Sequence, residues 1–414
     1  MKVFKFGGAS IKNAQAIENV VTILKSHASD KLLVVVSAMG KTTNALERIV
    51  SLGQAKKDFT RELEEVKSYH IQVLMDLGLA ESPALKLIEQ VVDQITTQAI
   101  QEGEYDRIYD QVVSLGEVLS SIIVSHYLQA SGIPVEWVDA RSMIVTDENW
   151  RAGNVDWIKT REAVQPLKKI LSEKIIITQG FIGASSTGST TTLGREGSDF
   201  SAAIFASCLE AHSVTIWKDV PGVMSADPKR LPNAIVFEEL PYQEAAEMTY
   251  YGATVIHPKT IKPLANSKIP LLVKNFDDPS LPGTRIHECQ IDHLPPLIVF
   301  KDNQCLISCK VTDYTFVNDH QIGHIFQALM NHDVRINVMQ NSAISFSICV
   351  DFHDQKVLKL IHVLSEHFEV YYNTGLTLIT IKNYDSVSYH EYRNRAGVIL
   401  EQSSRSTLQV LVKN

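Results

Sequence analysis

The sequence has little of what marks secreted, fibrous or disordered proteins. Its 414 residues include only five cysteines, and their scattered spacing (Cys208, Cys289, Cys305, Cys309 and Cys349) fits neither a disulfide framework nor a zinc site with two cysteine pairs. There is no proline-rich tract, polar repeat or long run of like charge, which argues against disorder. We therefore expect buried free thiols in a reducing cytosol, and a cytoplasmic protein.

Long apolar runs are missing as well. No stretch approaches the roughly 18 to 20 apolar residues of a membrane span, and Lys5 with the glycines after it interrupts the N-terminal apolar residues, so no signal peptide is indicated. The 39 basic and 47 acidic side chains give a net charge of −8, which argues against nucleic acid as the main partner, because phosphate backbones attract basic surfaces. A hydrophobic content of 45% is ordinary for a globular protein, and the length allows two or three domains.

What the sequence does contain is an alternation of strand and helix patterns. A short strand is predicted at residues 2–6, and apolar spacing typical of a helix follows it. Apolar runs of β-branched type occur at residues 32–36, 175–178 and 213–217, and such runs are typical of parallel strands buried on both faces. This alternation predicts an α/β layered domain.

The pattern changes near Leu294-Pro295-Pro296, where two prolines mark a linker. Residues 297–375 are then predicted to form β-α-β-β-α-β, the ferredoxin-like split unit. Residues 376–414 resemble the same unit cut off after its third strand. We therefore expect one large domain over residues 1–294, with a helical insert at 56–113, and two smaller units after it.

Two turns are candidate anion sites. Lys5-Phe6-Gly7-Gly8 ends a strand and opens a helix, where backbone N–H groups and the Lys5 ammonium could hold a phosphate; a plain tight turn is the alternative. The hydroxyl-rich stretch 183–194, which we expect to be a mobile flap, leads into Gly194-Arg195-Glu196-Gly197-Ser198-Asp199 at the start of another helix. Arg195 could bind a carboxylate through two parallel hydrogen bonds from its guanidinium, or it could be an ordinary exposed arginine.

Two common nucleotide motifs are absent. Gly40-Lys41-Thr42 mimics the end of a Walker A loop, but position 35 is valine where that loop needs glycine. No G-x-G-x-x-G fingerprint exists, which argues against a dinucleotide enzyme. The segment from Lys218-Asp219 through Pro221-Gly222 to Asp227-Pro228-Lys229 has clear turn chemistry and, taken alone, no sign of a ligand.

Six sequence blocks, in this order along the chain, together resemble the aspartate kinases of the amino-acid kinase superfamily. The blocks are Lys5 to Gly8, Ser37 to Asn44, Gly116-Glu117, Gly194 to Asp199, Lys218 to Pro228, and Tyr251 to Pro258. The resemblance covers essentially the whole chain. It implies the three-layer α/β fold of carbamate-kinase-like amino-acid kinases with a helical insert, followed by two ferredoxin-like α+β units of the ACT type, the second truncated.

The resemblance also implies a reaction. ATP, with Mg²⁺ bridging its phosphates, would phosphorylate the side-chain carboxylate of L-aspartate, the first step of lysine, threonine and methionine biosynthesis. A carboxylate with a pKa of about 4 is already ionised at neutral pH, so no general base is needed. Lys5 and Asp199 would be catalytic, with no metal ligand expected from the protein. The implied aspartate-binding residues are Thr43, Glu117, Arg195 and Ser198, and the implied ATP-binding residues are Lys5, Gly7, Gly8, Ser37, Lys218, Asp219, Lys229 and Thr254.

Three positions depart from the pattern of the family. Ala9 stands where many members have threonine, Glu196 adds a negative charge near the expected phosphates, and Thr254 replaces a lysine that contacts the nucleotide. Lys259 could substitute for that lysine. Because the other main residues implied for the site are intact, we expect an active kinase.

The ACT-like units imply regulation. In the family such units pair between subunits and bind an end-product amino acid, so we expect a homodimer through these units and lysine or threonine as effector. The implied effector residues are Asp319, Ile322, Asn337 and Ser342. The alternatives are a plain dimerisation module, a different amino-acid kinase such as a glutamate or acetylglutamate kinase, and a degraded kinase that serves as an amino-acid sensor and does not bind ATP.

Overall fold

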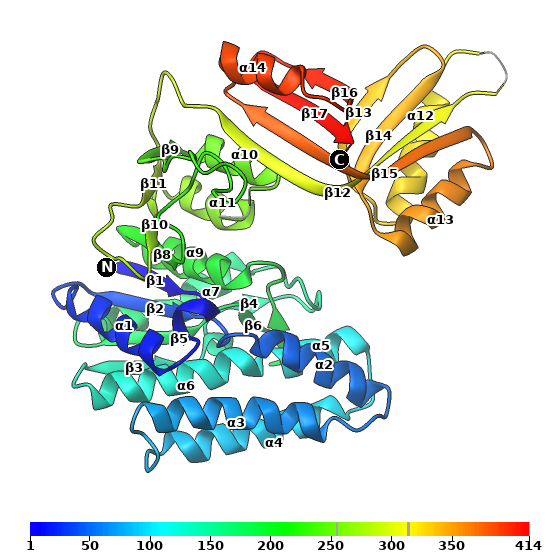
Figure 1. The fold of residues 1–414 in the computed structure, drawn as a ribbon. Helices are drawn as coiled ribbons and strands as arrows, with labels where there is room; N and C mark the ends of the chain where they lie inside the picture. The colour runs from blue at the N-terminus through cyan, green and yellow to red at the C-terminus, as the bar shows by residue number, and fades with distance from the viewer. Residues whose placement is uncertain (254–255, 313–314, 414) are drawn as a thin grey trace. The chain divides into compact units, whose positions relative to one another are not determined.

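The computed structural model describes residues 1–253, 256–312 and 315–413 (Figure 1). The chain forms two compact units, and it passes between them more than once. One unit consists of Met1–Val223, Val236–Ala246 and Thr254–Gln290, and the other of Met224–Ile235, Glu247–Ala253 and Ile291–Asn414. Two short segments that interrupt the first unit along the chain, Met224–Ile235 and Glu247–Ala253, therefore belong to the second unit.

An eight-stranded sheet is the frame of the first unit, in the order β3-β5-β2-β1-β8-β10-β11-β9. Lys5 on β1 pairs with Val35 on β2 and with Ile216 on β8. The strands from β3 to β10 are parallel, as the continuous apolar runs predict, and so their carboxyl ends meet at one edge. The strands are β1 (Lys2–Phe6), β2 (Leu32–Val36), β3 (Val135–Val138), β5 (Ile175–Gln179), β8 (Ser213–Lys218), β9 (Glu239–Pro241), β10 (Leu271–Asn275) and β11 (Thr284–His287).

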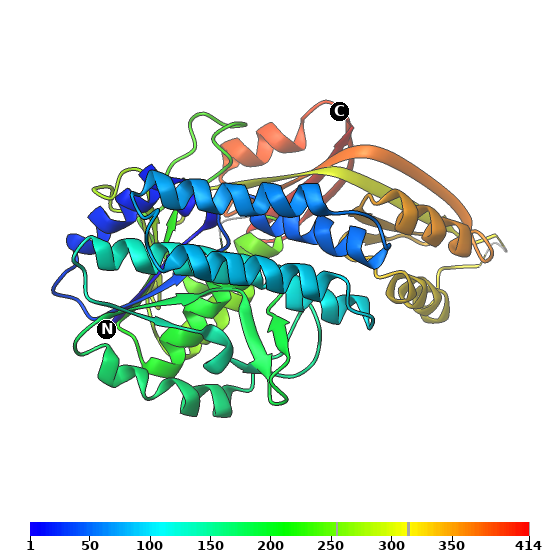
Figure 2. The same cartoon turned by 90° about the horizontal axis from the view of Figure 1, so that it is seen from below.

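Helices pack around this sheet, and α6 and α9 contact it directly. Helices α3, α4 and α5 occupy the predicted helical insert, and α3 and α4 lie side by side (Figure 2). The helices are α1 (Ala14–Lys25), α2 (Thr42–Gln54), α3 (Thr60–Asp76), α4 (Ala84–Ala99), α5 (Tyr105–Val113), α6 (Leu115–Ala130), α7 (Trp157–Val164), α8 (Leu167–Ile170), α9 (Gly197–Leu209), α10 (Tyr242–Tyr250) and α11 (Pro258–Asn266), with 3₁₀ turns η1 (Gly8–Ile11) and η2 (Ala140–Ser142).

One apolar stretch is longer than expected from the sequence. Helices α5 and α6 form a helical run, Tyr105–Ala130, that is long and apolar enough to span a membrane by length and composition alone. Its apolar window is 94% buried within the protein, which is the situation of a core helix. The prediction that no stretch approaches this length was therefore wrong.

A small three-stranded sheet stands beside the large one, in the order β4-β6-β7. It contains β4 (Val145–Thr146), β6 (Ile182–Ser185) and β7 (Thr190–Thr192). Strands β6 and β7 are antiparallel and form a hairpin with Gly188, at a φ of 84°, in its turn. Where the sequence suggested a flap without regular structure, at residues 183–194, the structure has this hairpin.

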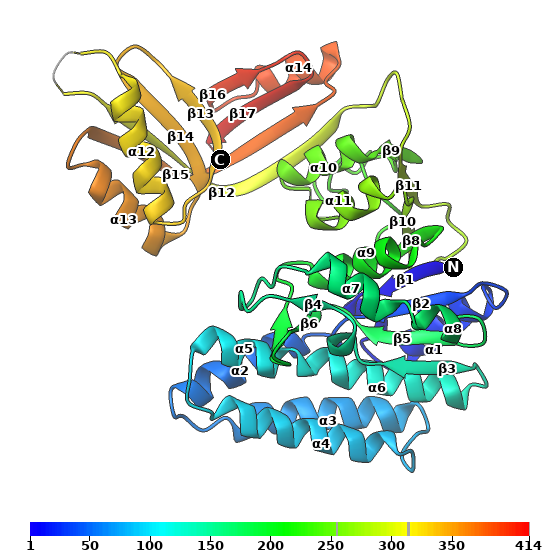
Figure 3. The same ribbon diagram turned by 180° about the vertical axis from the view of Figure 1, so that it is seen from behind.

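The second unit is built on one six-stranded sheet in the order β13-β14-β12-β15-β17-β16. Strands β12 and β15 are each 14 residues long and run through both halves of the sheet (Figure 3). The elements are β12 (Leu297–Lys310), α12 (Asp319–Asn331), β13 (Ile336–Asn341), β14 (Ser345–Asp351), α13 (Asp354–Leu364), β15 (Glu369–Lys382), α14 (Ser386–Arg393), β16 (Val398–Ser403) and β17 (Thr407–Lys413).

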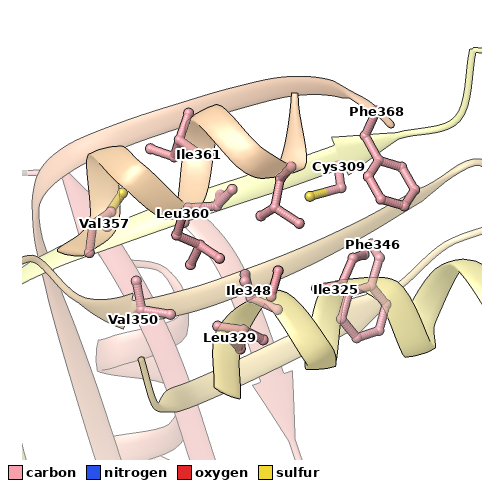
Figure 4. Packing of buried hydrophobic residues seen from close by; sticks show 14 of the residues in the cluster. Cys309, Ile325, Leu329, Phe346, Ile348, Val350, Val357, Leu360, Ile361 and Phe368 are labelled. Atoms are coloured by element: carbon pink, nitrogen blue, oxygen red, sulfur yellow. The ribbon is translucent and has the colours of Figure 1, made fainter. Parts of the chain in front are cut away.

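Each half of this sheet has its own helix-covered core. In the first half, α12 and α13 pack over Ile307, Ile348 and their neighbours (Figure 4). In the second half, α14 contributes Tyr392 to a core with Ile379 and Val410.

The second half also gains a strand that the sequence analysis had grouped with the first. Residues 297–301 of β12 pair with the 378–382 end of β15, which pairs with β17 on its other side. The second half therefore has four strands, although residues 376–414 supply only three of them. A register shift between Lys301 and Gln304 marks the point where β12 passes from one half to the other.

Candidate active site

A cavity of about 560 Å³ lies in the first unit where β1, β2 and β8 end and helix α9 begins. Ligands of open parallel sheets bind at this edge, because the loops after the strands converge there. Lys5 and Lys218 come from the ends of β1 and β8, Ser37 follows β2, and Glu117 lies on α6. Segments more than 200 residues apart in sequence thus share one cavity.

Two lysines and one buried aspartate form the charged centre of the cavity. The Asp199 Oδ1 atom lies 2.6 Å from the Lys5 Nζ atom, and Asp199 Oδ2 lies 3.5 Å from Lys218 Nζ. Burial alone would raise the pKa of Asp199, but the two ammonium groups outweigh it and hold that pKa below its usual value. The cluster carries one net positive charge, which suits a phosphate group.

Glu117 is the second buried carboxylate in the cavity, and it has few partners. Its Oε1 atom accepts a hydrogen bond of 3.3 Å from the Ala38 N–H, while Oε2 is buried and has no hydrogen-bond partner among the described residues. Burial raises the pKa of Glu117 to about 8. A buried carboxylate with an unfilled oxygen is a natural receptor for a cationic ligand group.

The first turn of helix α9 forms one wall of the cavity. A helix N-terminus offers free N–H groups and a partial positive charge, both of which favour anions. Arg195, just before the helix, is exposed, and Ser198 is half-buried in the first turn. Glu196 also faces the cavity, and its Oε2 atom is buried with no hydrogen-bond partner in the described part of the chain.

Backbone strain gathers around the same cavity. Arg151, Phe181 and Glu196 have φ angles of 62°, 68° and 53°, in the left-handed region that favours glycine, and all three line the cavity. Residues with side chains persist in this region only where the surrounding structure fixes them, and such positions cluster at functional sites.

Gly8 brings the ends of β1 and β2 together at the floor of the site. A Cβ atom at this position would lie 2.4 Å from the Ala38 carbonyl oxygen, so no other residue fits without a backbone shift. The Gly40 N–H donates to the Gly8 carbonyl at 3.1 Å. The close approach places Lys5, Ser37 and Gly8 around one small space.

Comparison with known proteins identifies the family. The sequence profile of the amino acid kinase family matches residues 1–275. The lysine-sensitive aspartokinase 3 of Escherichia coli is 31% identical over 356 residues, which cover 84% of this chain and 78% of the relative. The chain belongs to the aspartokinases of the amino acid kinase family.

Two further relatives define the extent of the match. Aspartokinase III of E. coli, solved with lysine and aspartate in its T-state, superposes with a TM-score of 0.83 at 27% identity, covering 100% of this chain and 96% of that one. The bifunctional aspartokinase/homoserine dehydrogenase 1 of Zea mays is 37% identical over 297 residues, or 70% of this chain and 32% of the relative. The chain spans about a third to a half of the length of the bifunctional relatives it matches.

Most of the predicted site residues of this aspartokinase lie in one place. The cavity is lined by nine of them: Lys5, Gly8, Ser37, Thr43, Glu117, Arg195, Ser198, Asp199 and Lys218. Gly7 and Asp219 do not line it, and Asp219 is exposed. Lys229 is exposed in segment 224–235 of the second unit, and Thr254 lies outside the described residues. The roles assigned to all these residues remain predictions.

Some lining residues were not predicted from the sequence. Tyr109, Arg151, Phe181 and Thr192 also line the cavity. Phe181 follows β5, so the rule that ligand-binding residues follow parallel strands could have found it. Thr192 lies in the hydroxyl-rich stretch 183–194 next to the predicted site, but nothing sets it apart from its neighbours there. Nothing in the sequence near Tyr109 or Arg151 signals a site, because these residues reach the cavity through contacts between distant segments.

The predicted effector residues lie in the second unit. Asp319 begins α12, and Ile322 packs against the core of the first half-sheet. The side chain of Asn337 on β13 accepts from Lys301 Nζ at 2.8 Å and donates to Gln304 Oε1 at 2.7 Å. Ser342 bonds to Ser345 in the turn after β13. These positions stay predictions as effector contacts.

Proposed function

We propose that this chain is an aspartate kinase, which transfers the γ-phosphoryl group of ATP to the side-chain carboxylate of L-aspartate and releases ADP and 4-phospho-L-aspartate. One observation supports it most: a single cavity holds a lysine cluster suited to phosphate and, separately, a buried carboxylate suited to an ammonium group. An amino acid with a phosphorylated side chain presents both of these groups.

The proposed binding of aspartate uses the wall residues of the cavity. Glu117 accepts the α-ammonium group, which fills its free oxygen and stabilises its ionised form. Arg195 holds the α-carboxylate through its paired N–H groups, and the hydroxyls of Thr43 and Ser198 donate to the substrate. The side-chain carboxylate then points toward Lys5.

The proposed transfer needs charge neutralisation and positioning more than acid–base chemistry. The substrate carboxylate attacks the γ-phosphorus, and the bond to the ADP oxygen breaks without any proton being moved. Lys5 and Lys218 neutralise the charge on the transferring phosphoryl oxygens, and the N–H groups of the first turn of α9 support them. Asp199 holds both ammonium groups in place.

We place the nucleotide beside Lys5, with Gly7, Gly8, Ser37, Lys218, Asp219, Lys229 and Thr254 as its predicted contacts. No cluster of three or more metal-ligating side chains occurs in residues 1–253, 256–312 and 315–413, and Asp199 is committed to two lysines. A magnesium ion bound to the ATP phosphates would neutralise part of their charge, and we propose no protein ligand for it.

Regulation belongs to the same proposal. We assign residues 1–294 to the kinase domain, with the 56–113 insert, and residues 297–375 and 376–414 to two ACT units. Strands β13 and β16 are the two edges of their sheet, and edge strands invite pairing with a second copy, so we propose a homodimer through this unit. Lysine is the first effector to test, because the related E. coli enzyme was solved with it. We also propose a cytoplasmic location.

A second candidate, an amino-acid sensor that no longer phosphorylates, is favoured by Glu196. Its carboxylate faces the cavity where the phosphates of ATP would lie, and like charges repel. A sensor of this kind binds amino acids and does not bind ATP.

The deciding experiment measures aspartate-dependent ATP consumption with Mg²⁺ and traps the acyl phosphate with hydroxylamine, with and without L-lysine or L-threonine. We expect aspartyl hydroxamate from the wild type and much less from Arg195→Ala, with glutamate a poor substitute for aspartate. Inhibition by either amino acid would name the effector. A folded protein that binds an amino acid yet makes no hydroxamate and binds no ATP would support the sensor instead.

A further inference from the structure

We propose that Asp110 is a positioning residue for the substrate: its buried carboxylate fastens the end of strand β7 and the turn at Arg151 to helix α5, and so sets where Arg195 and Arg151 face the cavity. Only the identity of the ligand that the cavity binds rests on the proposed function. The contacts of Asp110 are observed in the structure.

Both oxygens of Asp110 are occupied, and the donors come from distant segments. Oδ1 accepts from the Thr192 hydroxyl at 2.6 Å, and Oδ2 accepts from the backbone N–H groups of Thr192 and Arg151, each at 2.9 Å. The side chain is fully buried. A carboxylate with three donors and no contact with the cavity cannot touch the substrate, so its role is to hold other groups in place.

The two segments that Asp110 holds both line the cavity. Thr192 and Arg151 are lining residues, and Thr192 stands three residues before Arg195, the predicted ligand of the α-carboxylate. The Gly153 N–H donates to the Thr192 carbonyl at 2.9 Å, and Gln111 Nε2 donates to the Thr190 carbonyl at 2.8 Å. The hairpin strand that leads into Arg195 is therefore fixed from two sides.

Asp110 lies on α5, and Glu117, the predicted ammonium receptor, lies on the helix that follows it, α6. Asp110 and Glu117 are seven residues apart on the helical run Tyr105–Ala130, and two helical turns put both on one face. Two consecutive helices thus set the position of the residue for the ammonium group and of the segment for the carboxylate group. Their spacing matters because an α-amino acid presents both groups at a fixed distance.

The contacts of Asp110 also hold Arg151 in an unusual backbone conformation. Its backbone is left-handed, with a φ of 62°, and its guanidinium lies 4.1 Å above the Tyr109 ring and 3.1 Å from the Asp106 carboxylate. The hydrogen bond from the Arg151 N–H to Asp110 helps to hold this unfavourable backbone conformation. Burial raises the pKa of Asp110. The result is a second guanidinium at the cavity besides Arg195.

A matched pair of variants at Thr192, whose hydroxyl donates to Asp110, tests this positioning role. Thr192→Val removes the hydroxyl that donates to Asp110 and keeps the shape, whereas Thr192→Ser keeps the hydroxyl. We expect the KM for aspartate to rise about tenfold in Thr192→Val, as for loss of a hydrogen bond to a charged group, with kcat and the KM for ATP changed by less than about threefold. Thr192→Ser should stay within about threefold of the wild type. Equal KM values in the two variants, or a parallel loss of kcat and of both KM values, would overturn the proposal.

A second measurement does not need turnover. In Asp110→Ala, the Thr192 and Arg151 N–H groups and the Thr192 hydroxyl all lose their acceptor, so amide hydrogen exchange should quicken in residues 183–197 while the large sheet stays protected. Unchanged amide exchange in this segment would show that Asp110 does not hold it in place. If the wild type made no aspartyl phosphate, the function proposed above would fail, but the exchange result would still test whether Asp110 holds residues 183–197 in place.

Discussion

The candidate active site of this aspartokinase and the six-stranded sheet of its second unit differ in how their buried polar groups are satisfied. In the cavity of the first unit, Glu117 and Glu196 each keep a buried oxygen without a hydrogen-bond partner among the residues that the structure describes. In the second unit, Gln304 is fully buried yet its amide bonds to the Asp302 carbonyl, Asp351 and Asn337. Unfilled groups indicate where a ligand completes the structure, and filled networks indicate where the structure is complete by itself.

The sharpest way to break this comparison is Lys5→Ala, which removes the cation from the centre of the cavity. Asp199 would keep only the more distant Lys218, and the transferring phosphoryl group would lose its nearest positive charge. We expect kcat to fall by about a thousandfold, as for loss of a preorganised transition-state donor. Steady-state kinetics would measure it, with Lys2→Ala, a surface ion-pair variant, as control. A kcat within tenfold of the wild type would remove Lys5 from the mechanism.

The next effect should appear in substrate affinity rather than in turnover. Glu117→Gln keeps the shape of the side chain and removes the charge that is proposed to bind the ammonium group. We expect the KM for aspartate to rise by about 10- to 100-fold, since hydrogen bonds to charged groups contribute about 1.5–3 kcal/mol. The KM for ATP should hardly change. A rise in both KM values would mean that the residue supports the whole cavity instead.

The unfilled carboxylate also predicts a pH dependence of stability. Burial raises the pKa of Glu117 to about 8 from the ordinary glutamate value of 4.5. The folded state therefore holds a proton that the unfolded state releases between these values, and the free energy of unfolding should fall as the pH rises from about 5 to 8. Urea unfolding without ligand should show this fall, and Glu117→Gln should flatten it. Parallel profiles for the two proteins would mean that Glu117 titrates normally.

The smallest effect should come from the completed network of the second unit. Gln304→Ala leaves Asn337 and Asp351 each without one partner, and we expect a loss of about 2 kcal/mol in the free energy of unfolding, with kcat unchanged in the absence of effector. Chemical denaturation would measure it. Lys310→Ala, which removes an exposed ion pair with Glu369, is the control and should change stability by less than about 1 kcal/mol.

The sequence predicted those parts of the fold and site that local patterns encode. β2 was expected because five consecutive leucine and valine residues are typical of a strand buried on both faces, and all five are buried. Lys5, Glu117 and Asp199 were expected from motif blocks, and the structure places them in one cavity. Their catalytic roles remain to be measured.

Long-range contacts could not be predicted in the same way. Asp110 contacts residues 41 and 82 positions away, and nothing near it in sequence distinguishes it from an ordinary helix residue. Residues 297–301 were grouped with the first small unit, but they pair with the second half of the sheet, a pairing that no local pattern indicates. The same limit hid the membership of residues 224–235 in the second unit.

The two long strands of the second unit make its halves inseparable. A protease or a stop codon after residue 375 would cut β15 in mid-strand and leave residues 297–301 with an open edge and an uncovered apolar face. Such a fragment would be a candidate for aggregation rather than a smaller working module. Exchange of regulatory halves between related enzymes should therefore move residues 297–413 as one piece.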